Sequence, residues 1–331
     1  MRVSDVDSDL LEIARNNRTH LQNQCCTNFF GIHDRIKYMS AGMSMNDPAA
    51  IFARQVSDTF AAEVSGVDLA APMPTTTFER ILEIFYRYRV IFFPRQAISP
   101  RQLADFASKF GELENYHLAD FMLPEVPQVR IISNEIVDGR NVGATGAGMY
   151  WHSDLSYRPR PAGATLLYGL VCPSEGGNTK FADMVAAYAA LPEDTKKKIA
   201  GLRTVRDRSY RYSEFYPQRP PLTKAQKDAV PPVEHPLVRV HPVTGELALY
   251  VSAGSCSHIP GMDVEEGRKL ISELEKFATQ PRFVYSHPWK DGDLVVWDNC
   301  ATLHCATPFD TSNYIRKMQR VQALGGQPIP A

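Results

Sequence analysis

The chain has 331 residues, with 36 Lys and Arg against 37 Asp and Glu, a formal net charge of -1 and a pI near 6.8. This balance produces no long-range field that would favour nucleic acid or an anionic membrane surface, so we expect neither as a partner. No apolar run approaches the roughly 20 residues that a membrane span requires, and the first residues are too polar for a secretory signal, so the sequence predicts a soluble, cytoplasmic protein.

Residues 1–47 differ in composition from the rest of the chain, because they are polar and Asn-rich, with one short helix predicted at 8–16. This composition is typical of an appended arm or a poorly ordered leader rather than of a domain. The remaining residues, 48–331, are few enough to form one large domain with decorations. We therefore expect an N-terminal extension followed by a single domain.

The first half of this domain is predicted to mix capped helices with short strands. Thr75-Thr76-Thr77 precede an apolar stripe at helical spacing, and Ser99-Pro100 is a favourable start for a second helix that ends at Gly111. Strand-like runs occupy residues 90–93, 129–133, 164–171 and 179–182. The glycine-rich stretch 138–148 is predicted to be a mobile loop that closes over a substrate.

The second half is predicted to be rich in strands. Helices are expected at 184–191 and 193–200, and Asp263 with Glu266 is a start signal for another. Residues 206–232, rich in Arg, Tyr and Pro, are predicted to be a long irregular insertion that serves as a lid or rim. The predicted strands are 236–240, 247–252, 282–286, 294–298 and 314–323, with 291–293 as a hairpin turn. Many short strands with helices at the start and in insertions favour a mainly β fold with helical additions, a sandwich or jelly roll, over alternating βαβ units.

One segment carries the residue types of a metal site. Residues 150–157 alternate like a strand, which would put His152 and Asp154 on one face. His304, far along the chain, is a candidate third ligand. Two histidines and one carboxylate on one face of an iron ion leave the opposite face open, which is the arrangement of non-haem Fe(II) oxygenases. A surface His–Asp pair and a core histidine are the alternatives for these residues.

Two arginines near the C-terminus point to anionic ligands. In a strand, Arg316, Met318 and Arg320 would share one face. Buried guanidinium groups are unfavourable without anionic partners, and arginine pairs with carboxylates in a bidentate manner. A solvated basic strand is the alternative.

Six cysteines occur without any CxxC pair, which indicates reduced thiols rather than a disulfide framework. Cys300, His304 and Cys305 have the residue types of part of a zinc site. A structural zinc site normally takes four ligands from paired knuckles, and the second knuckle is missing. Zinc binding is therefore the less favoured hypothesis for this segment.

A series of motifs follows the order of those in a known enzyme family. They are Trp151-His152-Ser153-Asp154, Gly176-Gly177-Asn178-Thr179, His235-Pro236, His241-Pro242-Val243-Thr244-Gly245, Gly292-Asp293, Trp297-Asp298-Asn299, His304, and Arg316 with Arg320. In combination they resemble the taurine dioxygenase and 2,4-dichlorophenoxyacetate dioxygenase family of Fe(II)- and 2-oxoglutarate-dependent oxygenases. The resemblance extends over roughly residues 52–326.

The resemblance implies a double-stranded β-helix fold, a jelly-roll barrel with the metal at its mouth. It also implies an Fe(II) cofactor, with 2-oxoglutarate and O2 as co-substrates, and hydroxylation of a small anionic substrate with release of succinate and CO2. The implied metal ligands are His152, Asp154 and His304. Thr179 and Arg316 would hold the distal carboxylate of 2-oxoglutarate, and Arg320 would pair with an anionic group of the substrate.

The sequence departs from taurine dioxygenase around the substrate. That enzyme carries an Asn four residues before the first ligand histidine, where this chain has Gly148, and Tyr116 aligns with one of its substrate-contacting histidines. A carboxylate that is aryloxyalkanoate-like or derived from an amino acid is therefore at least as good a substrate hypothesis as a sulfonate. Tyr116, His117 and residues 206–216 are predicted to form the pocket wall.

Three questions stay open at this level. A metal-dependent hydrolase could use the same three ligands to activate water. A catalytically silent binding protein could keep the same fold. The sequence also leaves open whether the chain forms a homo-oligomer.

Overall fold

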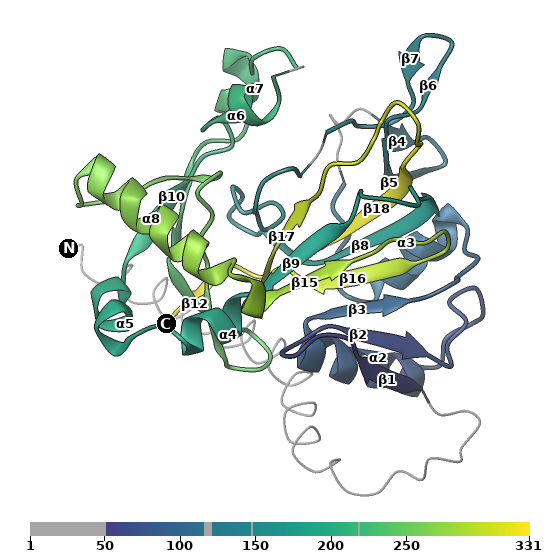
Figure 1. Cartoon of the computed structure of the whole chain (residues 1–331), viewed down its shortest axis with the longest axis horizontal. Helices are drawn as coiled ribbons and strands as arrows, with labels where there is room; N and C mark the ends of the chain where they lie inside the picture. The colour runs from purple at the N-terminus through teal and green to yellow at the C-terminus, as the bar shows by residue number, and fades with distance from the viewer. Residues whose placement is uncertain (1–50, 116–120, 147, 218) are drawn as a thin grey trace, which may run out of the picture. The chain divides into compact units, whose positions relative to one another are not determined.

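The computed structural model describes residues 51–115, 121–146, 148–217 and 219–331 (Figure 1). The predicted N-terminal extension, with its helix at 8–16, lies outside the described residues, as do Tyr116 and His117. None of the helices in the described part of the chain is both long and apolar enough to span a bilayer.

An eight-stranded sheet is the largest sheet among the described residues and forms one side of the domain (Figure 1). In spatial order its strands are β1 (Phe52–Gln55), β2 (Ala62–Ser65), β3 (Val90–Phe93), β16 (Leu294–Asp298), β8 (Ala162–Val171), β18 (Lys317–Leu324), β5 (Val126–Ser133) and β4 (Met122–Leu123). Neighbouring strands are antiparallel except β2 and β3, which are parallel. Strand β8 is buried along most of its length, because other elements cover both faces of the sheet.

Two helices, α2 (Thr75–Tyr88) and α3 (Pro100–Ser108), cover one face of this sheet. Their apolar stripes, which include Phe85 and Leu103, pack in one core cluster with Leu166 of β8 and Val296 of β16. Alternate residues of the same strands face the other way, as expected for a pleated sheet. The helices therefore close one side and leave the opposite side of the sheet for the site.

The ends of these helices agree only in part with the sequence signals. The Ser99 hydroxyl accepts a hydrogen bond from the backbone N–H of Gln102, whose side chain binds back to Ser99, so the predicted start of this helix is confirmed. The helix ends at Ser108 rather than at Gly111. The predicted threonine cap of α2 is wrong, because Pro74 occupies the N-cap position and no side chain caps the helix.

A three-stranded sheet faces the other side of the large one. It consists of β15 (Val284–His287), β9 (Thr179–Asp183) and β17 (Thr302–Ala306), with β9 in the middle. Phe181 of β9 packs in one cluster with Trp297 and Met318, which point inward from the large sheet. The predicted mainly β fold, with a jelly-roll core of two facing sheets and helical additions, is confirmed. The smaller sheet contributes two candidate site residues, Thr179 at the start of β9 and His304 on β17.

Most of the remaining described elements form a second packed region around α8 and two further three-stranded sheets, whereas α6 and α7 bury no residue (Figure 1). The helices are α4 (Met184–Ala189), α5 (Glu193–Ile199), α6 (Tyr212–Phe215), α7 (Lys224–Asp228), α8 (Val264–Ala278) and the 3-10 helix η1 (Pro281–Phe283). The two sheets contain β10 (Arg203–Arg206), β11 (Val233–Pro236) and β14 (Cys256–His258), and β12 (Val238–Val240), β13 (Leu247–Leu249) and β19 (Ile329–Pro330). Strands β6 (Ile136–Val137) and β7 (Arg140–Asn141) form a separate hairpin.

Several sequence predictions for this part of the chain are wrong in detail. Part of the predicted loop 138–148 belongs to the β6–β7 hairpin, and the insertion 206–232 contains α6 and α7. The turn at 291–293 connects β15 to β16, which belong to different sheets, so it is not a hairpin turn. Strand β17 was not predicted at all, because five residues are too few to give a distinct periodic signal.

Candidate functional site

The two candidate histidine ligands are joined through their backbones. The N–H of His152 donates to the carbonyl oxygen of His304 at 3.0 Å, and the reverse bond measures 2.9 Å. This isolated antiparallel bridge places the imidazole rings 4.1 Å apart. The predicted strand at 150–157 is wrong, because only His152 pairs in this way and a turn follows it.

Asp154 reaches the histidines through that turn. Leu155 has a φ of 55°, a left-handed conformation that bends the chain, and residues 153–156 are all buried rather than alternating. One carboxylate oxygen of Asp154, Oδ2, lies 3.5 Å from His304 Nε2, and Oδ1 lies 3.9 Å from His152 Nε2. The three candidate donor atoms lie within 4.8 Å of one another.

Hydrogen bonding and burial give these side chains the protonation states of metal ligands. His152 Nδ1 lies 2.8 Å from the carbonyl oxygen of Tyr150, which only accepts, so Nδ1 carries the proton and Nε2 keeps a lone pair. Burial lowers the pKa of His152, and burial with the neighbouring His152 lowers the pKa of His304 to about 3. Burial alone would raise the pKa of Asp154, but His304, Arg320 and His152 together lower that pKa to about 2. Two neutral imidazoles and a charged carboxylate suit a divalent transition metal such as Fe(II).

The two arginines occupy different depths of this region. Arg320, on β18, places its Nη1 3.7 Å from Asp154 Oδ1, and it shares the inner face of the strand with Met318. Arg316 lies just before the strand begins, not within it as predicted. Its side chain is buried, and its Nε donates to the carbonyl oxygen of Gly177 at 3.1 Å. Burial lowers the pKa of Arg316 to about 10, which means that its charge is poorly solvated.

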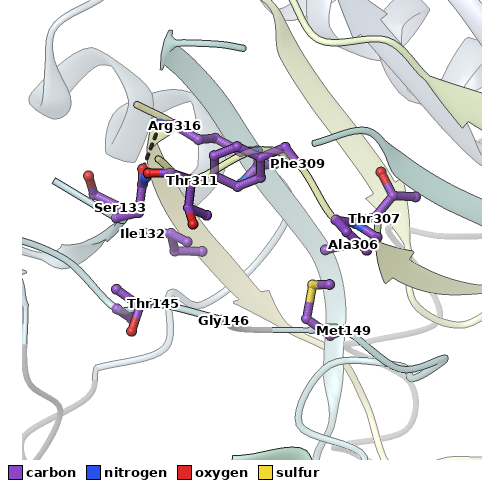
Figure 2. A pocket seen from close by; sticks show the side chains of 13 residues that line it. Ile132, Ser133, Thr145, Gly146, Met149, Ala306, Thr307, Phe309, Thr311 and Arg316 are labelled. Atoms are coloured by element: carbon purple, nitrogen blue, oxygen red, sulfur yellow. Dashed lines mark hydrogen bonds between the residues drawn. The ribbon is translucent and has the colours of Figure 1, made fainter. Parts of the chain in front are cut away.

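Arg316 lines a cavity of about 310 Å³ (Figure 2). The other lining residues are uncharged: Ile132, Ser133, Asn134, Ala144, Thr145, Gly146, Met149, Ala306, Thr307, Pro308, Phe309 and Thr311. Ala306 and Thr307 come two and three residues after His304, and the N–H of Ala306 donates to the carbonyl oxygen of Gly148, which packs beside His152, so the cavity begins near the candidate metal ligands. A cavity with one buried cation among neutral walls suits a small anion.

Thr179 and Arg316 meet at Trp289. The Nε1 of Trp289 donates to Thr179 Oγ1 at 3.0 Å, and the Arg316 guanidinium lies 5.7 Å from the centre of the same indole. The sequence did not single out Trp289. Its only signal is its position after His287-Pro288 and before the turn at 291–293.

An aromatic stack links the insertion to the site. Phe215 of α6 stacks on Tyr150 with ring centres 4.0 Å apart, and Tyr150 lies 4.9 Å from the His152 ring. A Cβ at Gly254 would approach the Tyr150 ring to 2.4 Å, so only glycine fits beside it. The segment 206–216 therefore contacts the neighbour of a candidate ligand, while Tyr116 and His117 lie outside the described residues.

The zinc hypothesis for Cys300 finds no support in its surroundings. Among described residues, Cys300 groups with His241 and Asp298 rather than with His304. The Nδ1 of His241 accepts two backbone N–H bonds, so its Nε2 carries the proton and donates to Asp298 Oδ2 at 2.7 Å. Burial raises the pKa of the Cys300 thiol to about 12. These donors are already used within a closed hydrogen-bond cluster.

Comparison with known proteins identifies one family. The model of the family described as taurine catabolism dioxygenase TauD, TfdA family matches residues 53–322. The chain is 39% identical over 246 residues to the alpha-ketoglutarate-dependent 2,4-dichlorophenoxyacetate dioxygenase of Burkholderia sp. (strain RASC), covering 71% of this chain and 82% of the relative. It is 36% identical over 285 residues to the enzyme of the same name from Cupriavidus pinatubonensis, and this match covers 83% of this chain and 98% of the relative.

A solved structure agrees with this assignment. The crystal structure of AAD-2 in complex with Mn(II) and N-oxalylglycine superposes with a TM-score of 0.72 at 36% sequence identity. The match covers 84% of this chain and 99% of that one. The similarity thus extends over the whole described domain rather than over one motif.

Proposed function

Because this chain belongs to the taurine catabolism dioxygenase TauD, TfdA family and is an Fe(II)- and 2-oxoglutarate-dependent dioxygenase, we propose that it oxidises a small aryloxyalkanoate-like carboxylate. One observation carries the proposal. Three metal-donor side chains converge within 4.8 Å, with Arg320 beside them and Arg316 in the adjoining cavity. The hydrolase and silent-protein hypotheses are not favoured, because neither explains why one arginine lies beside the metal-donor side chains while another, buried arginine lines the adjoining cavity.

His152, Asp154 and His304 are the proposed metal ligands. Three protein ligands on an octahedral ion leave three positions for small molecules. Fe(II) bound there would supply O2 activation coupled to oxidative decarboxylation of 2-oxoglutarate. The protein's part is to hold both imidazoles neutral and the carboxylate charged, which the burial and hydrogen bonds of these residues support.

Arg316 and Thr179 are proposed to hold the distal carboxylate of 2-oxoglutarate. Arg316 is 9% exposed, and no carboxylate pairs with it in the described structure. A dicarboxylate entering the cavity would therefore supply the missing anion, and the pairing would be strong because the site is desolvated. Thr179 and Arg316 both contact the indole of Trp289, so the Thr179 hydroxyl can donate a second hydrogen bond to the same carboxylate.

Arg320 is proposed to receive the anionic group of the substrate. Its guanidinium lies beside Asp154 and so places a bound carboxylate close to the metal ligands. The Tyr150–Phe215 stack offers an apolar, aromatic surface near His152, which suits an aryl ring better than the short chain of taurine. Tyr116 and His117 remain proposed wall residues from the sequence alone.

The proposal is tested by 2-oxoglutarate-dependent succinate release with phenoxyacetate, 2,4-dichlorophenoxyacetate, an alkyl sulfate and taurine. We expect turnover with the aryloxyacetates and little with taurine. In Arg320→Ala the KM for the aryloxyacetate should rise about 100-fold, because the charge pair with the substrate carboxylate is lost, while that for 2-oxoglutarate changes little. In Arg316→Ala the KM for 2-oxoglutarate should rise, while that for the aryloxyacetate changes little.

A matched control is Arg160→Ala, which removes an arginine that is paired with Glu112 near the surface. It should leave both KM values within about twofold. Equal losses for both compounds in the Arg316 and Arg320 variants would contradict the separate roles. If no anion of the panel supported succinate release, the proposed substrate class would be contradicted.

A further inference from the structure

Asp154 is held by a closed ring of hydrogen bonds that involves two residues outside the ligand set. The Thr165 hydroxyl lies 2.8 Å from Asp154 Oδ2, and Asn299 Nδ2 lies 2.9 Å from the same hydroxyl. The backbone N–H of Asp154 completes the ring by donating to Asn299 Oδ1 at 3.0 Å. Three segments, separated by 11 and 134 residues, therefore meet at one carboxylate.

The chemistry of the groups fixes the direction of every bond in this ring. A backbone N–H only donates, so the amide oxygen of Asn299 must face Asp154 and its NH₂ group must face Thr165. The Thr165 oxygen accepts from that NH₂ group, and its own hydrogen is then directed at Asp154 Oδ2. An ionised carboxylate is a strong acceptor for this hydrogen.

The ring is rigid because its members are buried and anchored. Thr165 has 0% of its surface exposed and Asn299 has 1%. Thr165 lies in the middle of β8, between Trp297 of β16 and Gln322 of β18 in the ladder. The backbone of Asn299 is also held on both sides, by its N–H bond to Gly163 and by the Ser153 hydroxyl at its carbonyl oxygen.

We propose that Thr165, oriented by Asn299, is a positioning residue that lets Asp154 bind the metal through one oxygen only. The hydroxyl donates to Oδ2, which also lies 3.5 Å from His304 Nε2, and so holds the rotation of the carboxylate, with Oδ1 on the side of His152 and Arg320. A carboxylate that bound through both oxygens would take up a coordination position that 2-oxoglutarate or O2 needs. This inference rests on the proposed function, because it assumes the metal ligands named there.

The experiment compares Thr165→Val, which keeps the shape and removes the hydroxyl, with Thr165→Ser, which keeps the hydroxyl. Binding of Mn(II) is titrated by electron paramagnetic resonance, and the visible absorption band of the anaerobic Fe(II)–2-oxoglutarate complex is recorded. Thr165→Val should weaken Mn(II) binding about 10- to 100-fold, typical for loss of a hydrogen bond to a metal ligand, and shift the band. Thr165→Ser should restore both to within about threefold of the unmodified protein.

The control is Thr302→Val, which removes another buried threonine hydroxyl, one that donates to the carbonyl oxygen of Asp298 at 2.6 Å. It should leave Mn(II) binding and the band unchanged. If Thr165→Val does not fold, Asn299→Asp provides the second test, because an aspartate cannot donate to Thr165 and turns its hydroxyl away from Asp154. Metal binding should again weaken.

Two results would overturn the inference. One is unchanged Mn(II) affinity and an unchanged band in a folded Thr165→Val or Asn299→Asp protein. The other is an equal loss in Thr302→Val. If the unmodified protein bound no Mn(II) at all, the ligand assignment itself would fail, which separates failure of the proposed function from failure of this inference.

Discussion

His235 lies on β11 with 2% of its surface exposed, and its Nε2 lies 2.8 Å from the carbonyl oxygen of Arg158, shortly after the candidate ligands. Burial is the main cause that lowers the pKa of His235 to about 4; the nearby Arg206 and Arg239 act in the same direction, and the hydrogen bond to the Arg158 carbonyl opposes them. A free histidine in the unfolded chain titrates near 6.5. The folded protein therefore holds His235 neutral where the unfolded chain becomes protonated.

This difference predicts a loss of stability in mild acid. The group's contribution is fully present above about pH 6.5 and is lost as the pH falls toward about 4, because the unfolded state binds the proton first. Between pH 7 and pH 5 the free energy of unfolding should fall by on the order of 1 kcal/mol more than in His235→Gln. Urea unfolding at both pH values measures this. An equal pH dependence in the two proteins would show that His235 is not responsible.

At the scale of elements, the segment 138–148 ends next to His152, a candidate metal ligand. Gly148 has a φ of +75°, and its backbone oxygen accepts a hydrogen bond from the N–H of Ala306, just after β17. A Cβ at this position would lie 3.1 Å from Cε1 of His152. The glycine thus serves both the left-handed backbone and the packing of the imidazole.

Gly148→Ala should weaken metal binding by displacing His152, and Gly139→Ala is its matched control. Gly139 also has a positive φ, +72°, but a Cβ there would meet nothing within 4 Å. Both substitutions should cost about 1 kcal/mol of stability from backbone strain. Only Gly148→Ala should reduce Mn(II) affinity, by about tenfold. Similar Mn(II) affinities in the two variants would show that the approach to His152 has no consequence.

At the scale of the whole domain, the site joins elements that are distant in sequence. The segment at 152–154, β17 and β18 each supply one or two of its charged or metal-binding side chains. Asp154 brings these elements together through His304 and Arg320. Ligands that bridge them should therefore stabilise the fold as a unit.

We expect Mn(II) with N-oxalylglycine to raise the melting temperature relative to protein treated with a chelator. At about 100 times the dissociation constant, binding contributes about 2.7 kcal/mol, which corresponds to roughly 5 °C for a domain of this size. His304→Ala should abolish the shift, whereas Arg160→Ala should retain it. Differential scanning calorimetry provides the measurement. A full shift in His304→Ala would place the ligand elsewhere.

The sequence by itself determined what depends on local order along the chain. The Ser99 cap, the apolar faces of α2 and α3, and the strand-rich second half follow from side-chain chemistry within a few residues. The motif order also identified the family, because it combines residue types that are rare together. The metal-binding roles of the ligand residues remain predictions, from the sequence and from the structure alike.

The tertiary structure alone decided how these residues meet. Alternation predicted a strand at 150–157, but the bridge to His304 and the left-handed Leu155 make a turn, and Thr165 with Asn299 completes a ring around Asp154. Cys300 likewise groups with His241 rather than with His304. Periodicity reports only which face of its own element a side chain occupies, whereas each of these contacts joins residues far apart in the chain. The energies of these contacts outweigh the local preference for a strand.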